Sequence, residues 1–218
     1  MNTKYKAVLF DLDGTLLDTL QDITDSVNEA LRCLGYPQHK QEAYKYFVGE
    51  GREIMAIRSL PERHRDPATV SKLVDLINVE YAKRWAVNTR PYHGITALLD
   101  ELTAKDVKMA VLSNKADELT KMAVSTMLSE WQFEAVAGAL PDVPRKPDPT
   151  AALRIARSLG FQPAEFIYLG DSDTDMKTAA SAGMYPAGAS WGFRTPDELI
   201  AGGARTLIEH PCDLLRLL

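Results

Sequence analysis

The sequence has only two cysteines, Cys33 and Cys212, which lie far apart in a chain of 218 residues. Such a pair provides neither the disulfide framework of a small secreted domain nor a closely spaced metal-binding motif. We therefore expect two free thiols, buried or half-buried as isolated cysteines usually are. Histidine is also scarce and shows no metal-ligand spacing, so we expect its four copies at the surface or at helix ends: His39, His64, His93 and His210.

The chain also lacks long apolar runs and an excess of positive charge. No run approaches the length of a membrane span, and the first residues, MNTKYKAVLFD, lack the cleavage site of a signal peptide. The 25 Lys and Arg residues are outnumbered by 30 Asp and Glu residues, so the net charge is −5. Binding to nucleic acid calls for a basic face. We therefore expect a cytoplasmic protein with neither nucleic acid nor a membrane as its partner.

The composition is otherwise that of an ordinary globular protein, with 45% hydrophobic and 25% charged residues. Residues 18–88 show helical spacing without a convincing strand. From Pro91 onward, amphipathic helices alternate with short apolar strands, predicted at 108–112, 133–136, 166–169, 185–189 and 205–208. Such alternation predicts βαβ units and a parallel sheet covered on both faces. The expected fold class is α/β, a Rossmann-like three-layer core (residues 1–17 and 89–218) with a small all-helical domain (residues 18–88) inserted after the first strand.

Local signals also mark several helix boundaries. Asp66-Pro67 reads as a cap and a first helical position, for a helix that reaches about Trp85. Gly160 and Gly183 follow amphipathic segments and are expected to end two helices of the core, because glycine readily adopts the left-handed conformation found there.

The most informative stretch is Ala7–Leu17, which reads AVLFDLDGTLL. Its apolar run is typical of a buried strand, which ends at Asp11, and Asp13 follows two residues later. Gly14 then permits a backbone turn. Acids at the end of a buried strand are costly unless a cation or a substrate occupies the site. A bare pair of aspartates is usually an ordinary polar turn, but the complete pattern is far more specific.

Other polar residues stand at the ends of predicted strands or open helices beside them. Ser113 follows one strand and Asp171 another, Lys146 lies in a loop before a helix, and Asp175 lies in the helix after Asp171. Taken alone, the serine reads as a helix cap, the lysine as a solvated charge, and the two acids as a helix start. Because ligands of an open parallel sheet bind at the carboxyl ends of its strands, we expect these side chains to converge.

These four segments, in this order and over essentially the whole chain, resemble the four motifs of the haloacid dehalogenase superfamily of phosphotransferases. The resemblance implies that Asp11 is the nucleophile and forms an aspartyl-phosphate. It implies that Asp13 first donates a proton to the leaving group and then takes one from water. The Asp11 carboxylate, the Asp13 backbone carbonyl and Asp171 would hold Mg²⁺, with Asp175 orienting its surroundings.

The resemblance also assigns the groups that bind phosphate. Ser113 and backbone amides near Asn114 would bind the phosphoryl oxygens, and Lys146 would stabilise the transferring group. Asp13 distinguishes phosphotransferases from the dehalogenase branch, which lacks an acid there. The helical insert resembles the cap domain of the family, a lid over the active site.

Three further segments resemble phosphoglycolate phosphatases: Val48–Arg52, Leu112–Lys115 and Trp191–Phe193. The expected activity is thus a Mg²⁺-dependent phosphomonoesterase acting on a small phosphorylated metabolite, with 2-phosphoglycolate as the first choice. Arg52 is expected to pair with the substrate carboxylate, although it could equally open a solvated helix.

Several alternatives stay open at this point. Within the superfamily they are a β-phosphoglucomutase, a pyrophosphatase and a sugar-phosphate phosphatase. Phosphonate hydrolysis would need a Schiff-base lysine from the insert, for which the candidates are Lys40, Lys45, Lys72 and Lys83. Outside the enzymes, a phosphate-binding regulatory module such as a receiver domain gathers similar residues, but it is shorter and lacks the insert. Both a monomer and a homodimer are compatible with the sequence.

Overall fold

The computed structural model describes residues 4–218. Residues 1–3, which belong to the predicted core and to the segment inspected for a signal peptide, lie outside the described residues. The chain divides into two compact units, which we call the core unit (residues up to Leu17 and Pro91–Leu218) and the helical unit (Asp18–Arg90). The predicted boundary between residues 88 and 89 lies two positions before the observed one.

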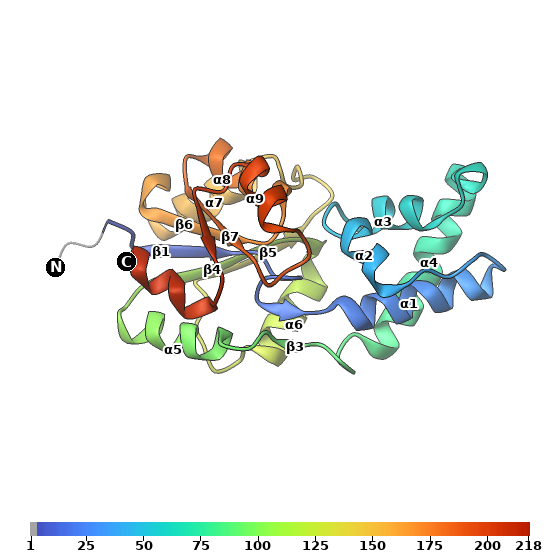
Figure 1. Ribbon diagram of the computed structural model, residues 1–218, viewed down its shortest axis with the longest axis horizontal. Coiled ribbons are helices and arrows are strands. Elements are labelled where there is room, and N and C mark those ends of the chain that lie inside the picture. The colour runs from blue at the N-terminus through green and yellow to red at the C-terminus, as the bar shows by residue number, and fades with distance from the viewer. Residues whose placement is uncertain (1–3) are drawn as a thin grey trace. The chain divides into compact units, whose positions relative to one another are not determined.

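The core unit is built around one sheet of six parallel strands, in the order β5-β4-β1-β6-β7-β8 (Figure 1). Strand β1 (Ala7–Phe10) lies in the middle, between β4 (Lys108–Ala116) and β6 (Phe166–Gly170). All four of its residues are buried, as the apolar run predicts. The outer strands are β5 (Ala135–Ala139), β7 (Tyr185–Ala189) and β8 (Thr206–Ile208). The predicted α/β fold with a parallel sheet is confirmed.

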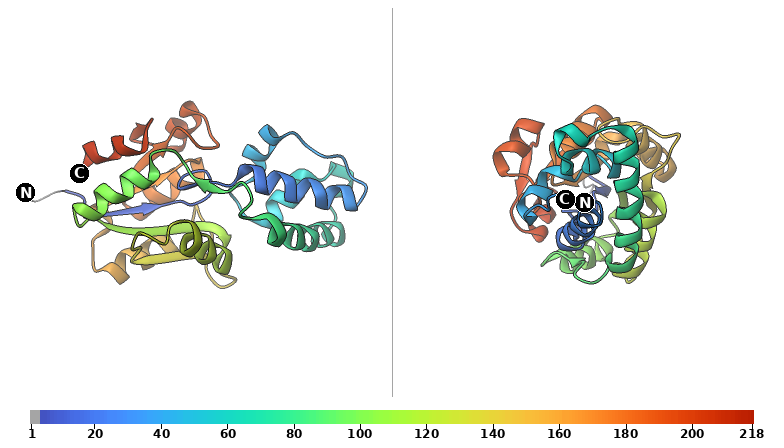
Figure 2. Two further views of the ribbon diagram at one scale, coloured as in Figure 1. Left: turned by 90° about the horizontal axis from the view of Figure 1, so that it is seen from below. Right: turned by 90° about the vertical axis from the view of Figure 1, so that its right-hand side faces the viewer.

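Helices cover both faces of this sheet. Helices α7 (Thr150–Leu159) and α8 (Asp173–Ala182) lie on one side and α5 (Ile95–Ala104) on the other (Figures 1 and 2). Leu9 and Tyr168 from neighbouring strands pack with Ile155 of α7 and Ala179 of α8 in a buried cluster. The remaining helical segments are α6 (Asp117–Met127), α9 (Pro196–Gly202), η2 (Pro163–Glu165) and η3 (Pro211–Leu217). The three-layer arrangement thus places the ends of β1, β4 and β6 side by side.

The helical unit contains α1 (Leu20–Cys33), α2 (Gln41–Phe47), α3 (Arg52–Ser59), η1 (Glu62–His64) and α4 (Pro67–Arg84). Asp66 caps α4 as predicted, because its side chain accepts a hydrogen bond from the Thr69 N–H at 3.0 Å. The two chain connections to the core unit, β2 (Leu17–Asp18) and β3 (Arg90–Pro91), pair as a two-stranded sheet. Along residues 4–218, none of the helices combines the length and apolar character needed to cross a membrane.

Some sequence-based expectations were wrong in detail. Strand β4 continues to Ala116 rather than ending at residue 112, because Ala116 pairs with Ala139 of β5 after a shift in register. Strand β5 begins at Ala135, two residues later than predicted. Cys33 is exposed at the end of α1 rather than buried, whereas Cys212 is half-buried as expected.

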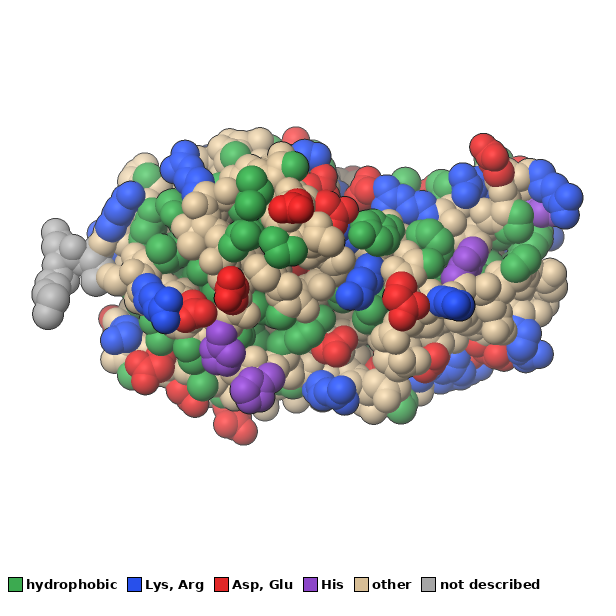
Figure 3. Space-filling view, viewed as in Figure 1, with side chains coloured by type: hydrophobic (Ala, Val, Ile, Leu, Met, Phe, Trp, Pro, Cys, Tyr) green, Lys and Arg blue, Asp and Glu red, His purple; other side chains and the backbone are tan. Residues whose placement is uncertain are grey.

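Acidic and basic side chains are interspersed over the face of the molecule drawn in Figure 3.

Candidate active site

Asp11 lies directly after β1 and is held at the edge of the sheet. Its N–H donates to the Leu169 carbonyl of β6 at 2.9 Å, so the strand pairing continues one residue further. The chain then turns tightly, and the Leu12 carbonyl accepts from the N–H groups of Leu16 and Leu17, both at 3.0 Å. Gly14 has a φ of +90°, and an ideal Cβ at this position would lie 2.3 Å from Asp171 Oδ2. Only glycine therefore allows this turn to lie so close to Asp171.

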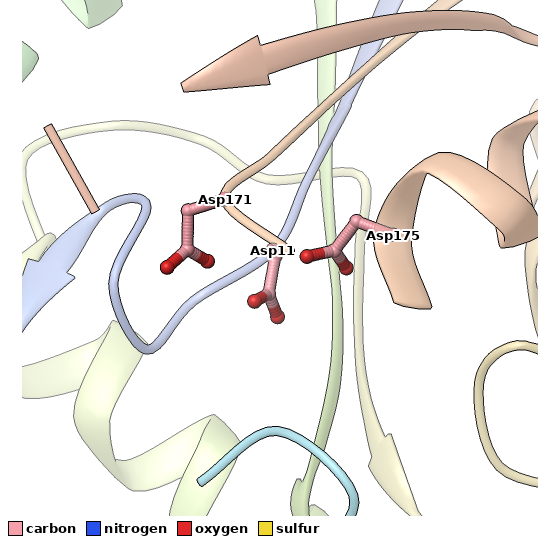
Figure 4. A group of neighbouring side chains, drawn as sticks. All are labelled: Asp11, Asp171 and Asp175. Atoms are coloured by element: carbon pink, nitrogen blue, oxygen red, sulfur yellow. The ribbon is translucent and has the colours of Figure 1, made fainter. Parts of the chain in front are cut away.

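Three buried carboxylates meet at this edge of the sheet. Asp11 comes from the end of β1, Asp171 follows β6, and Asp175 lies in the first turn of α8. One oxygen of each lies within 4.8 Å of the others, and Figure 4 shows the three side chains next to one another, with Asp11 between Asp171 and Asp175. Burial, followed by the charge of Asp175, raises the pKa of Asp11 well above its ordinary value and that of Asp171 to about 7. The cluster therefore holds more negative charge than the protein balances.

Lys146 is the cation of this cluster. Its Nζ donates to Asp11 Oδ1 and Asp175 Oδ1, both at 2.7 Å, and to the Leu112 carbonyl at 3.1 Å, which engages all three ammonium hydrogens. Burial alone would lower the pKa of this lysine, but Asp11 and Asp175 raise it well above 10.5. Asn114 fixes the Lys146 backbone, accepting from its N–H at 2.9 Å and donating to its carbonyl at 3.1 Å. Its side chain thus supports the lysine, while the predicted role of nearby amides in phosphate binding stays a prediction.

Asp175 is surrounded by donors. Its Oδ2 accepts from the Ser172 N–H at 3.1 Å and the Ser172 hydroxyl at 2.5 Å. Its Oδ1 accepts from Lys146 and, at 3.3 Å, from the Tyr168 hydroxyl. These contacts fix the Asp175 carboxylate at the start of α8. Its predicted role in orienting the surroundings of a metal ion stays a prediction.

Asp13 lies outside the three-carboxylate cluster and pairs with Lys115. The Lys115 Nζ donates to Asp13 Oδ1 at 2.8 Å, and the two side chains are only 7% and 13% exposed. The Lys115 N–H also donates to the Ser113 hydroxyl at 3.2 Å. Lys115 thus contacts two predicted site residues, and the sequence interpretation had assigned it no role. Its position two residues after Ser113, at the end of a strand, was the available signal.

The structure also places Trp191 and Phe193 at the site, although the sequence analysis noted their segment only for its resemblance and assigned them no role. The Phe193 N–H donates to Asp171 Oδ2 at 2.7 Å, and the Thr15 hydroxyl donates to Asp171 Oδ1 at 3.1 Å. Trp191 Nε1 donates to the Thr15 carbonyl at 3.0 Å.

Arg52 belongs to the helical unit, where it opens α3 and donates to Asn78 of α4. Its predicted contact with a substrate stays a prediction.

The donor set fits a divalent cation. When all three carboxylates are ionised they carry a formal charge of −3 and the Lys146 ammonium carries +1, so a charge of −2 is left for a bound ion to balance. Magnesium prefers oxygen ligands of this kind. Asp11, Asp171 and Asp175 could therefore hold a metal ion, and the predicted participation of the Asp13 carbonyl adds a further oxygen.

A profile of the family described as haloacid dehalogenase-like hydrolase matches residues 8–189. The chain belongs to this family of enzymes, and its curated relatives place it among the phosphatases of the family. The phosphoglycolate phosphatase of Aquifex aeolicus (strain VF5) is 29% identical over 98% of this chain and 96% of its own. That of Thiobacillus denitrificans (strain ATCC 25259 / T1) is 31% identical, over 82% of this chain and 80% of its own. A crystal structure from Lactobacillus delbrueckii subsp. bulgaricus, 29% identical, has a TM-score of 0.91 and covers 97% of both chains.

Proposed function

We propose that the protein is a Mg²⁺-dependent phosphomonoesterase that works through an aspartyl-phosphate on Asp11. The observation that carries the proposal is the buried Asp11 carboxylate, 2.7 Å from Lys146 and within the acidic cluster at the sheet edge. A carboxylate nucleophile divides one difficult displacement into two easier ones. Membership of the family and the resemblance of all four motifs support this assignment.

In the first step, Asp11 attacks the phosphorus atom and the substrate oxygen leaves. The contact with Lys146 falls on Oδ1, so we assign the attack to Oδ2. Lys146 holds the nucleophile in place and offsets the charge of the phosphoryl oxygens, and the Ser113 hydroxyl binds one of those oxygens. Asp11, Asp171 and the Asp13 carbonyl would hold Mg²⁺, which would supply further positive charge to offset that of the phosphoryl group.

Asp13 moves the protons in both steps. It donates a proton to the leaving alkoxide, then removes one from the water that attacks the aspartyl-phosphate and releases inorganic phosphate. The Lys115 ammonium donates to the Asp13 carboxylate at 2.8 Å and so orients the Asp13 side chain. Because the same lysine donates its N–H to Ser113, it links the acid–base residue to the phosphate-binding hydroxyl.

We propose that the substrate is a small phosphorylated metabolite, with 2-phosphoglycolate as the first choice. The names of the curated relatives support this choice, as does Arg52, whose guanidinium suits a carboxylate. The amino-acid composition supports a cytoplasmic location. We keep both a monomer and a homodimer as proposals for the active form.

The test is a panel of phosphorylated metabolites and one aryl phosphate, assayed with the wild type and Asp11→Asn, with and without Mg²⁺. We expect phosphoglycolate to give the highest kcat/KM, and activity to require Mg²⁺. Asp11→Asn should abolish turnover while the far-ultraviolet circular dichroism stays unchanged, because an amide cannot act as the nucleophile. Turnover of this variant within tenfold of wild type would refute the assignment of Asp11. Preference for another metabolite would refute the substrate alone.

A further inference from the structure

The segment Trp191–Phe193 follows β7 and reaches across the carboxyl end of the neighbouring strand β6. Its position is fixed by the preceding residue, whose N–H donates to the Ile208 carbonyl of β8 at 3.0 Å. From there the backbone passes directly against Asp171, the residue that follows β6. The sequence analysis noted this segment for its resemblance to phosphoglycolate phosphatases, but the proposed reaction gives none of its three residues a role.

Gly192 makes the close approach possible. An ideal Cβ at this position would lie 2.2 Å from the Cβ of Asp171 and 2.5 Å from its Oδ2. It would also lie 2.5 Å from the Gly14 carbonyl oxygen. Any side chain at position 192 would therefore push the backbone away from both the turn after β1 and Asp171. The missing side chain brings the next amide, that of Phe193, to 2.7 Å from Oδ2.

Trp191 acts through Thr15 on Oδ1, the other oxygen of the Asp171 carboxylate. Its Nε1 donates to the Thr15 carbonyl at 3.0 Å, which anchors the residue whose hydroxyl donates to Asp171 Oδ1 at 3.1 Å. Donors from two separate segments thus fix the two oxygens, and Asp171 is 1% exposed. Two fixed oxygens leave the carboxylate one orientation, toward Asp11 and Asp175.

We propose that Trp191–Phe193 is a positioning segment, which holds Asp171 in the orientation that metal binding needs and thereby sets the affinity for Mg²⁺. The inference rests on the metal site of the proposed function. It differs from a purely packing role, in which the segment would contribute to stability without changing how tightly the metal binds. Groups that orient metal ligands usually change metal affinity about 10- to 100-fold when they are removed.

The test compares Gly192→Ala and Trp191→Phe with the wild type, using Mg²⁺ binding measured by calorimetry in the absence of substrate. The phenylalanine keeps an aromatic ring and removes the Nε1 donor. Gly188→Ala is the matched control, since the three atoms nearest to its added Cβ would be side-chain atoms of Leu199, Leu207 and Ala204, at 3.2–3.3 Å. Thermal unfolding of each protein without metal gives the stability change. We expect both test variants to bind Mg²⁺ roughly 10- to 100-fold more weakly, and the control to bind like the wild type.

The outcomes separate the inference from the proposed function. A wild type that hydrolyses phosphoglycolate with Mg²⁺ but whose two test variants bind Mg²⁺ as tightly as it does would overturn the inference alone. A wild type that binds no Mg²⁺ would overturn the metal site and the inference with it. If Gly192→Ala does not fold, Trp191→Phe decides, because it removes one hydrogen bond and leaves the backbone unchanged. A control that loses affinity as strongly as the test variants would also contradict the positioning role.

Discussion

Asp22 fastens the end of the helical unit to α1, and its removal gives a sharp test of how that unit is held together. Its carboxylate is 1% exposed and accepts from residues 66 and 67 positions later. The Asn88 N–H lies 3.0 Å from both oxygens, and the Asn88 Nδ2 lies 2.9 Å from Oδ1. The Thr89 N–H and hydroxyl both lie 2.8 Å from Oδ2. The Asp22 carboxylate thus accepts the hydrogen bonds of both backbone N–H groups and both side chains of Asn88 and Thr89, the segment that leads into β3.

The structure gives the size of the effect. Thr89 is buried, so its N–H would lose its acceptor in Asp22→Ala, which costs roughly 1–3 kcal/mol. Asn88 is exposed, so water would replace most of its lost contacts, at a cost nearer roughly 0.5–1.5 kcal/mol. We therefore expect Asp22→Ala to lower the free energy of unfolding of the helical unit by about 2–4 kcal/mol, and Asp22→Asn, which keeps one acceptor, by about half as much.

The effect should depend on pH in one direction. Burial by itself raises the pKa of Asp22, but hydrogen bonds from the side chains and backbones of Asn88 and Thr89 bring the pKa below its ordinary 3.8. A carboxyl whose pKa is lower in the folded state stabilises the fold above its unfolded pKa. That stabilisation is lost as the pH falls through the folded pKa. The difference between the wild type and Asp22→Asn should thus be constant from pH 5 to 8 and shrink below about pH 4.

The assay is urea unfolding followed by circular dichroism, together with hydrogen exchange of the Thr89 amide, because the two units need not unfold in one transition. Asp25→Asn is the control, since Asp25 lies on the same helix and its carboxylate accepts from its helix neighbour Gln21. We expect faster exchange at Thr89 in both Asp22 variants and little change in the control. A stability difference at pH 3 equal to that at pH 7, or unchanged exchange at Thr89, would refute the reasoning.

Two further predictions concern turnover. Asp13→Ala should lower kcat about 10²–10⁴-fold, because one group acts as acid and then as base; an aryl phosphate with a good leaving group should restore the first step but leave the aspartyl-phosphate to accumulate, and full steady-state turnover would contradict the dual role. Arg52→Ala should lower kcat/KM for phosphoglycolate about ten- to over a hundredfold, the worth of a charge-assisted contact of roughly 1.5–3 kcal/mol, with little change for the aryl phosphate. Equal losses on both substrates would mean that Arg52 supports folding of the helical unit and does not contact the carboxylate.

The features predicted correctly from the sequence are those with a local cause. The run Ala7–Phe10 predicted the central strand, because four consecutive apolar residues are typical of a strand that is buried on both faces. Asp66-Pro67 gave the start of α4, and Gly160 and Gly183 ended α7 and α8 with φ of 74° and 75°. Each of these signals acts within a few residues, so the neighbours in the chain carry enough information.

The features that sequence reasoning missed are single contacts between distant segments. Lys115 reaches Asp13 across 102 positions, and Trp191 reaches the Thr15 carbonyl across 176. No spacing or periodicity marks such a pair, because both partners are set by how the strands are ordered in the sheet. The two-residue strands β2 and β3 were missed for another reason, since two residues are too few to show an alternating pattern.

The contacts of the three carboxylates also indicate which of them is better placed to bind a metal ion and which to hold Lys146. Asp175 is compensated by the Lys146 ammonium, the Tyr168 hydroxyl and both donors of Ser172. Asp171 accepts from neutral groups, the Thr15 hydroxyl and the Phe193 N–H, and its pKa is raised to about 7. Since a cation gains most beside the carboxylate whose charge is balanced least, Asp171 is a stronger candidate for a metal ligand than Asp175. Asp175 is better suited to holding Lys146 against Asp11. Asp171 and Asp11, the proposed nucleophile, are then the better candidates to hold the proposed metal ion.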